Sequence, residues 1–273
     1  MSIQRFLILA LLALLPLQRA AADILVLVHG YASDARTWEL SGVNDQLQAQ
    51  GWPRAGVLTA AFGGATGAPA SLNKSYSVNL PAQAPLLVQA QYLRASLQLL
   101  RQYYPDERLI LAGHSAGGVV ARLVLLGGNP FRVDTLVTIA APHLGTFRAG
   151  QGLDVVDSKP FFCPGPGIDF LKHVVGGSDY EYLHDSRAVL VDLLPAESGN
   201  LLAWMNMQPH PDIAYYSVIR QLPNVAGDSI VPAYSQDMNN VPALHGRSQT
   251  LLVPAGHGLA PQDGTLLAGI LAR

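Results

Sequence analysis

The chain has 273 residues, of which 49% are hydrophobic and 13% are charged, against roughly 25% charged residues in an average soluble domain. This apolar content excludes a disordered polymer, and the formal net charge of −2 argues against nucleic acid as a partner. Single α/β domains commonly reach about 250 residues, so we expect one domain over 23–273 around one large core.

The first 22 residues have the pattern of a secretory signal peptide. Arg5 precedes a nearly unbroken apolar run from Phe6 to Leu15, and the small residues Ala20-Ala21-Ala22 precede Asp23. The run is about half the ~20 residues that a membrane-spanning helix needs. We therefore predict cleavage before Asp23 and a secreted or periplasmic protein, with an uncleaved anchor or a buried first helix as the alternative.

Short apolar runs of strand length alternate with helical patterns along the rest of the chain. The expected strands are Ile24–Val28, Val57–Ala60, Arg108–Ala112, Val133–Ala140, Ile213–Ile219 and Gln249–Val253. Helical spacing relates Leu86, Ala90, Leu93, Leu97 and Leu100, and again Val119, Leu123 and Leu126. Nearly continuous apolar strands are typical of a parallel sheet covered on both faces, so the pattern predicts an α/β fold with its site at the carboxyl ends of the strands.

Two stretches interrupt this alternation. Phe62 to Asn79 is rich in small and polar residues and is expected to be a loop. Residues 145–211 are too long for a plain connection and are expected to form an insertion over the strand ends. Two apolar pieces within it suggest a lid that opens at a lipid surface, with core packing as the alternative: Ile168, Leu171, Val174 and Val175, and then Leu201, Leu202, Trp204 and Met205. The single cysteine, Cys163, is interpreted as a small apolar residue.

The strongest chemical signal is the sequence Gly113-His114-Ser115-Ala116-Gly117-Gly118, which follows an expected strand and opens an expected helix. Between a strand and a helix, Gly-x-Ser-x-Gly is typical of a sharp turn that exposes a nucleophilic serine. Glycines on both sides remove side chains that would collide with neighbouring backbone. Ser115 is therefore the candidate nucleophile.

A serine nucleophile of this type needs two N–H donors for the oxyanion that forms on the substrate. The N–H of Ala116, next to the nucleophile, is one candidate. The end of the first strand, Val28-His29-Gly30-Tyr31, offers the second, and we assign it to the N–H of Tyr31.

The base and the orienting acid are expected in the chain order serine, acid, histidine. Among eight histidines, His257 follows the last expected strand between two glycines and is our choice, with His245 as the rival. We expect His29 and His143 to satisfy backbone hydrogen bonds instead.

Asp228 is the candidate acid because it follows an expected strand and precedes His257 by one further strand. Asp212 precedes its strand and so falls at the wrong end of the sheet. Asp237 and Asp263 are interpreted as solvated loop acids.

These residues resemble the serine lipases and esterases of the α/β-hydrolase family, especially secreted bacterial triacylglycerol lipases. The likeness rests on residues 28–31, 113–118, 140–146 and 227–232, together with His257. It implies the α/β-hydrolase fold, a triad of Ser115, Asp228 and His257, and oxyanion donors at Tyr31 and Ala116. Where calcium-dependent relatives usually carry an aspartate, two positions past the histidine, this chain has Leu259.

We therefore expect a carboxylic ester hydrolase that acts on apolar acyl chains and needs no cofactor or metal. The expected partner is a small-molecule or lipid ester, with transient contact to a lipid surface. An acyltransferase or thioesterase could use the same three residues, and a binding module without activity could use the same fold.

Overall fold

The computed structural model describes residues 22–59, 73–157, 182 and 185–272. Apart from Ala22, the predicted signal peptide lies outside these residues, as do Cys163 and the apolar positions between Ile168 and Val175. Among the described residues, no helix is long and apolar enough to cross a membrane.

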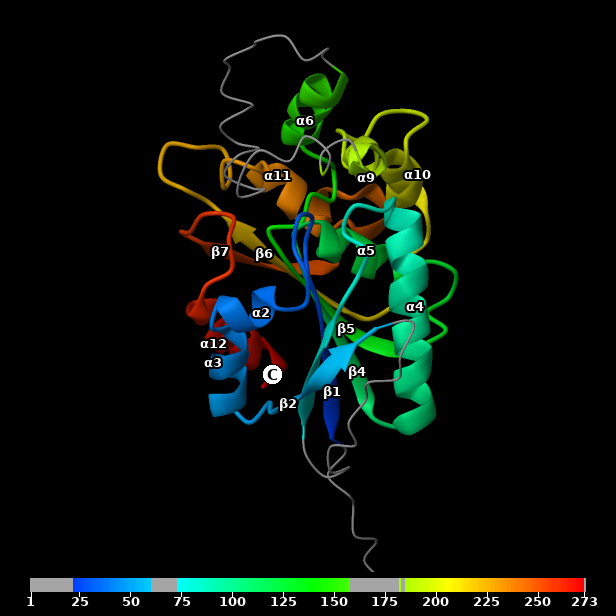
Figure 1. Ribbon diagram of the computed structural model, residues 1–273, viewed down its shortest axis with the longest axis vertical. Helices are drawn as coiled ribbons and strands as arrows, with labels where there is room; N and C mark the ends of the chain where they lie inside the picture. Colours follow the sequence, from blue (N-terminus) through cyan, green and yellow to red (C-terminus); the bar gives the residue numbers. More distant parts are fainter. Residues whose placement is uncertain (1–21, 60–72, 158–181, 183–184, 273) are drawn as a thin grey trace, which may run out of the picture.

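The described part of the chain folds around a seven-stranded sheet in which all neighbouring strands are parallel. The strand order is β2-β3-β1-β4-β5-β6-β7 (Figure 1). The strands are β1 (Asp23–Val28), β2 (Arg54–Leu58), β3 (Lys74–Val78), β4 (Arg108–His114), β5 (Val133–Ile139), β6 (Ala214–Arg220) and β7 (Ser248–Val253). Helices lie on both faces of this sheet, so the predicted α/β fold with a parallel sheet is confirmed.

Helices cover the two faces of the sheet and bury alternate residues of each central strand. Side chains of α4 (Leu86–Tyr103) and α5 (Ala116–Leu125) share one apolar cluster with Ile24 and Val26 of β1. Leu25 and Leu27 point to the other face, which α3 (Val43–Ala49) and α12 (Pro261–Leu271) cover. Both faces of β1 are therefore buried from solvent, which explains its unbroken apolar sequence.

The prediction of a loop over 62–79 is wrong for its last residues, because residues 74–78 form β3 between β2 and β1. Three of the five residues of this strand are polar, and its apolar pattern was therefore too weak to indicate a strand. Tyr76 and Val78 pack in the α4 and α5 cluster, and the buried ammonium group of Lys74 lies 4.6 Å from the centre of the Tyr104 ring.

Three helices within residues 145–211 lie over the carboxyl ends of the strands (Figure 1). They are α6 (Phe147–Asp157), α9 (Arg187–Asp192) and α10 (Leu201–Met207). α10 divides the second apolar piece between two environments: Leu202 and Met205 are fully buried core residues, whereas the Trp204 side chain is 52% exposed. Shorter helices, namely α2 (Thr37–Leu40), α11 (Ala233–Gln236), η1 (Met238–Asn240) and η2 (Pro242–Leu244), complete the described elements.

The strand order reverses direction at β1. The chain passes from β1 to β2 and β3 on one side of it, and then returns to β4 on the other side. In open α/β sheets, ligands bind at the carboxyl ends of the strands beside such a reversal. At this point β1 ends next to the segment His29-Gly30-Tyr31, and β4 ends next to Ser115.

Candidate active site

Ser115 occupies the sharp turn between β4 and α5. Its backbone has φ 52° and ψ −131°, a strained conformation for a residue with a side chain. A Cβ atom on Gly113 would lie 2.5 Å from Gly118 Cα, and one on Gly117 would lie 2.2 Å from the His29 carbonyl oxygen. Both motif glycines are therefore required by close approach of the backbone.

Substituting Gly117 with alanine should lower the free energy of unfolding by about 1 to 3 kcal/mol, because the new methyl group must displace the backbone of β1. The displaced segment includes Tyr31, so hydrolysis should also slow if its N–H holds the oxyanion. Urea unfolding and esterase assays would measure both effects. Gly269→Ala is the matched control, since a Cβ there meets nothing within 4 Å inside α12 and should stabilise the helix slightly. Equal stability of the two variants would contradict the prediction.

The fold brings Ser115, His257 and Asp228 into one chain of hydrogen bonds. His257 Nδ1 lies 2.7 Å from Asp228 Oδ2, and His257 Nε2 lies 2.9 Å from Ser115 Oγ. A buried aspartate carboxylate only accepts, so Nδ1 carries the proton and Nε2 is free to accept from the serine hydroxyl. This is the tautomer that a general base requires.

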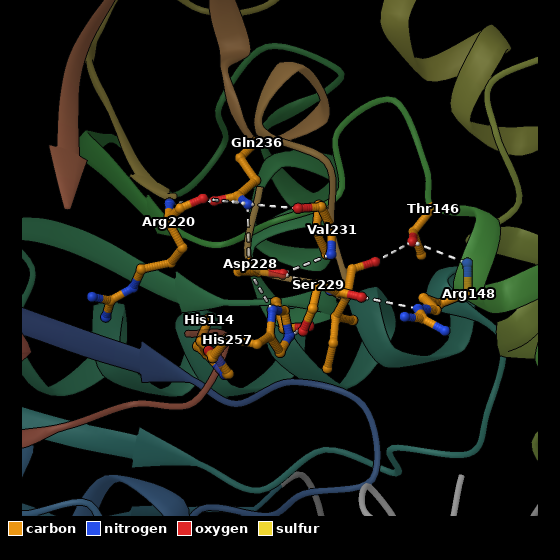
Figure 2. Close-up of polar contacts among 11 residues, drawn as sticks. His114, Thr146, Arg148, Arg220, Asp228, Ser229, Val231, Gln236 and His257 are labelled. Carbon is orange, nitrogen blue, oxygen red and sulfur yellow. Dashed lines mark hydrogen bonds and ion pairs between the residues drawn. The ribbon is translucent and has the colours of Figure 1, made fainter. Parts of the chain in front are cut away.

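The loop after β6 holds the Asp228 carboxylate in place, and the side chain is fully buried. Oδ1 accepts the backbone N–H groups of Ile230, at 2.9 Å, and of Val231, at 2.7 Å. Oδ2 faces His257 and also accepts a bond from Gln236 Nε2 at 3.3 Å (Figure 2). Both carboxylate oxygens therefore have hydrogen-bond partners, which fix the orientation of the carboxylate toward the imidazole.

The rival histidine and acids lie elsewhere. His245 is exposed and its ring bonds to the Asn239 backbone, while Asp212 is solvent-exposed at the opposite end of β6. Asp237 caps η1 through the Asn239 N–H. The interpretation of Asp263 as a solvated acid is wrong: it is 1% exposed and forms a buried ion pair with Arg220.

One proposed oxyanion donor, Ala116, follows Ser115 in sequence, and the other, Tyr31, lies in the loop after β1 that passes close to Ser115. Ala116 is the first residue of α5, so its N–H has no acceptor within the helix. A Cβ on Gly30 would lie 2.8 Å from Ser115 Cβ, which shows how closely the β1 loop passes the serine. The Gly30 carbonyl accepts a bond from His29 Nδ1 at 2.9 Å, and in a trans peptide the following N–H, that of Tyr31, points the opposite way.

His29 fulfils its expected backbone role, and His143 does not. His29 Nε2 accepts the Leu80 N–H at 2.9 Å, so its other nitrogen carries the proton that bonds to Gly30. Burial lowers the pKa of His29, which keeps this arrangement neutral. The His143 ring instead bonds to the Thr138 hydroxyl at 3.1 Å.

Three residues around the site escaped the sequence interpretation: His114, Gln236 and Arg220. His114 Nε2 donates to the His257 carbonyl oxygen at 2.8 Å, and the two rings lie 5.1 Å apart. Burial, together with the neighbouring His257, lowers the pKa of His114 to about 3. His114 belongs to the serine motif and could have been suspected, whereas no local pattern marks Gln236 or Arg220.

Buried histidines should make the protein less stable in mild acid. Burial and the nearby charge of Arg122 lower the pKa of His210 to about 4. Between pH 6.5 and 4, His210 is therefore protonated in the unfolded chain and neutral in the folded protein. The free energy of unfolding falls as the pH falls through this range. His210→Gln should recover about 2 kcal/mol of the stability lost between pH 7 and pH 4.5. Urea unfolding at both pH values would measure this, and the exposed His245→Gln should recover none.

No group of three or more potential metal-ligating side chains occurs among the described residues. Leu259, two positions after His257, is partly buried and packs against the apolar cluster that contains α3 and α12 residues.

A family model described as a PGAP1-like alpha/beta domain matches residues 75–154. This segment includes Ser115 and excludes Asp228 and His257. The chain is 42% identical over 66 residues to a Yarrowia lipolytica protein named as a predicted GPI inositol-deacylase C, and 35% identical over 65 residues to a GPI inositol-deacylase of Debaryomyces hansenii. The matches cover 22% and 21% of this chain, and only 8% and 6% of those longer proteins.

Solved structures match over nearly the whole chain. A Bacillus licheniformis lipase in its mature form has a TM-score of 0.63 at 14% identity, covering 93% of this chain and 91% of that one. A Listeria innocua protein has a TM-score of 0.60 at 14% identity, covering 92% and 94%. A bottromycin epimerase also matches, with a TM-score of 0.53, 18% identity and coverage of 92% and 91%. The TM-scores over nearly the whole chain confirm the predicted α/β-hydrolase fold. The epimerase match shows that this fold alone does not define the reaction.

Proposed function

We propose that the protein is a serine hydrolase that cleaves carboxylic esters through an acyl-enzyme. The observation that carries this proposal is the hydrogen-bond chain from Ser115 through His257 to the buried Asp228, at 2.9 and 2.7 Å. The names of the relatives and structural neighbours, which include deacylases and a lipase, support it.

In the proposed reaction, His257 Nε2 takes the Ser115 proton while Oγ attacks the ester carbonyl carbon. The N–H groups of Tyr31 and Ala116 hold the oxyanion. His257 then protonates the leaving alcohol, which leaves the acyl group on Ser115. Water attacks this acyl-enzyme with His257 again as base, and the carboxylic acid departs as the serine is restored.

An apolar acyl chain is the substrate feature that we propose next. Leu87, Trp204 and Met207 are all at least half exposed, and they line an open groove of about 820 Å³ between α4 and α10. Exposed apolar side chains gathered in one groove suit contact with an acyl chain or a lipid surface. We propose that this part of the insertion is a lid that opens at a lipid surface.

We also propose that the chain is exported, as the pattern of its first 22 residues indicates.

Hydrolysis of p-nitrophenyl esters of increasing acyl length by the purified protein would test the function. We expect release of p-nitrophenol, a preference for longer acyl chains, and a fluorophosphonate adduct on Ser115 detected by intact mass. Absence of both hydrolysis and labelling in a folded sample would overturn the proposal. Products formed in the presence of a competing alcohol would distinguish hydrolysis from acyl transfer, and a thioester series would test the thioesterase alternative.

Trp204→Ser should weaken activity on emulsified long-chain esters roughly tenfold more than on soluble short-chain ones, which corresponds to the loss of ~1.4 kcal/mol of apolar contact. The Trp204 side chain is half exposed, so the melting temperature should change little. Leu252→Ser, at another exposed apolar residue, on β7, is the control and should leave both activities unchanged. Equal losses on both substrates with a lower melting temperature would show that Trp204 is a packing residue.

A further inference from the structure

The loop that carries Asp228 is tied to the backbone of Arg220, the last residue of β6. The Gln236 side chain makes this connection: its Oε1 accepts the Arg220 N–H at 2.6 Å, and its Nε2 donates to the Arg220 carbonyl at 3.2 Å. The same Nε2 lies 3.3 Å from Asp228 Oδ2 and 2.8 Å from the Val231 carbonyl. Figure 2 shows Gln236 between Arg220 and Asp228. The backbone of Arg220 is therefore linked to the Asp228 carboxylate through the Gln236 side chain.

The side chain of the same arginine is tied to the segment that follows His257. Arg220 Nη2 forms an ion pair with Asp263 Oδ1, and both side chains are 2% exposed. Asp263 Oδ2 accepts the Ala260 N–H at 2.9 Å, three residues after His257. Asp263 lies in the first turn of α12, so the ion pair joins the end of β6 to the start of that helix.

Stability alone is a poor explanation for this buried pair. Removing two charges from water costs several kcal/mol per ion, and apolar residues of similar volume often replace such pairs with no loss of stability. Here the cost is higher still, because the buried Arg220 Nε has no hydrogen-bond partner among the described atoms. An apolar side chain at position 220 would keep the backbone bonds to Gln236, but it would lose the directional bond from Nη2 to Asp263.

We propose that Arg220 is a positioning residue, which holds the His257 loop in fixed register with the Asp228 loop through its ion pair with Asp263. This inference rests on the proposed function, since His257, oriented by Asp228, would serve as the general base for Ser115. A looser register would lengthen the His257–Asp228 contact of 2.7 Å and lower kcat, because proton transfer depends steeply on donor and acceptor geometry. The acyl-binding groove is not touched, so KM should remain nearly constant.

The double variant Arg220→Met/Asp263→Asn removes both charges at nearly constant side-chain volume, and the asparagine side-chain oxygen can still accept the Ala260 N–H. We expect it to fold with nearly the wild-type melting temperature, and to lose kcat roughly 10- to 100-fold at nearly constant KM. In proton NMR, the downfield resonance of His257 Nδ1–H should broaden or disappear. Arg220→Lys, which keeps a charged donor for Asp263, should restore most of the activity and the resonance.

The control is Arg108→Met/Asp23→Asn, which removes a partly exposed ion pair of 2.6 Å from the opposite end of the sheet and should leave kcat unchanged. If the Arg220 double variant does not fold, Asp263→Asn provides the test, with an expected kcat loss of roughly 5- to 20-fold. Wild-type kcat and an unchanged resonance in the folded Arg220 double variant, or in Asp263→Asn, would overturn the proposal. Lack of esterase activity in the wild type would instead defeat the proposed function, while the resonance would still report on positioning.

Discussion

Replacing Ser115 with alanine should lower kcat for ester hydrolysis by roughly 10⁴- to 10⁶-fold and leave the melting temperature nearly unchanged. The hydroxyl is the proposed nucleophile, and its one-atom removal abolishes the acyl-enzyme route while retaining the Cβ and the strained turn at φ 52°. Hydrolysis of a p-nitrophenyl ester and intact mass after fluorophosphonate treatment would measure the effect.

Ser33→Ala is a suitable control for this experiment. Ser33 is a partly buried serine in the loop after β1, where its hydroxyl bonds to Thr37. The Ser33→Ala variant should therefore keep full activity and still form the fluorophosphonate adduct. Residual hydrolysis by Ser115→Ala within tenfold of wild type would show that another group attacks the ester.

Replacing Asp228 with asparagine should lower kcat roughly 10⁴-fold with little effect on folding. The structure dictates how the amide must sit: its oxygen faces the N–H groups of Ile230 and Val231, which leaves its NH₂ group toward His257 Nδ1. The imidazole would then carry its proton on Nε2, the nitrogen that must accept from Ser115. Because the positions of the side chains are retained and only the His257 tautomer changes, KM should vary far less than kcat.

Asp237→Asn is the matched control for this tautomer effect. Asp237 lies in the adjoining segment and accepts the Asn239 N–H, but it has no contact with His257, so its amide variant should keep wild-type kcat. Comparable losses in the two variants would indicate a general effect of charge near the site and would contradict the tautomer explanation.

Local patterns carried much of the information about this protein. Unbroken apolar strands such as β1 predict a parallel sheet, because both faces must be covered, and the sheet has that arrangement. The glycines around Ser115 likewise predicted a tight turn from the sequence, since such a turn leaves no room for side chains at Gly113 and Gly117. Chain order after each strand selected Asp228 and His257, because the carboxyl ends of parallel strands share one edge, and the fold brings both residues beside Ser115.

Tertiary packing decided what local patterns could not. β3 is polar in sequence and becomes an internal strand because its neighbours β2 and β1 supply its hydrogen bonds and its Tyr76 reaches the core. Asp263 is acidic and near the chain end, which suggests solvation, yet it is buried because Arg220, 43 positions earlier, pairs with it. The ionic partner of a buried charge is a property of the assembled fold, since residues so far apart meet only after the strands and helices have packed.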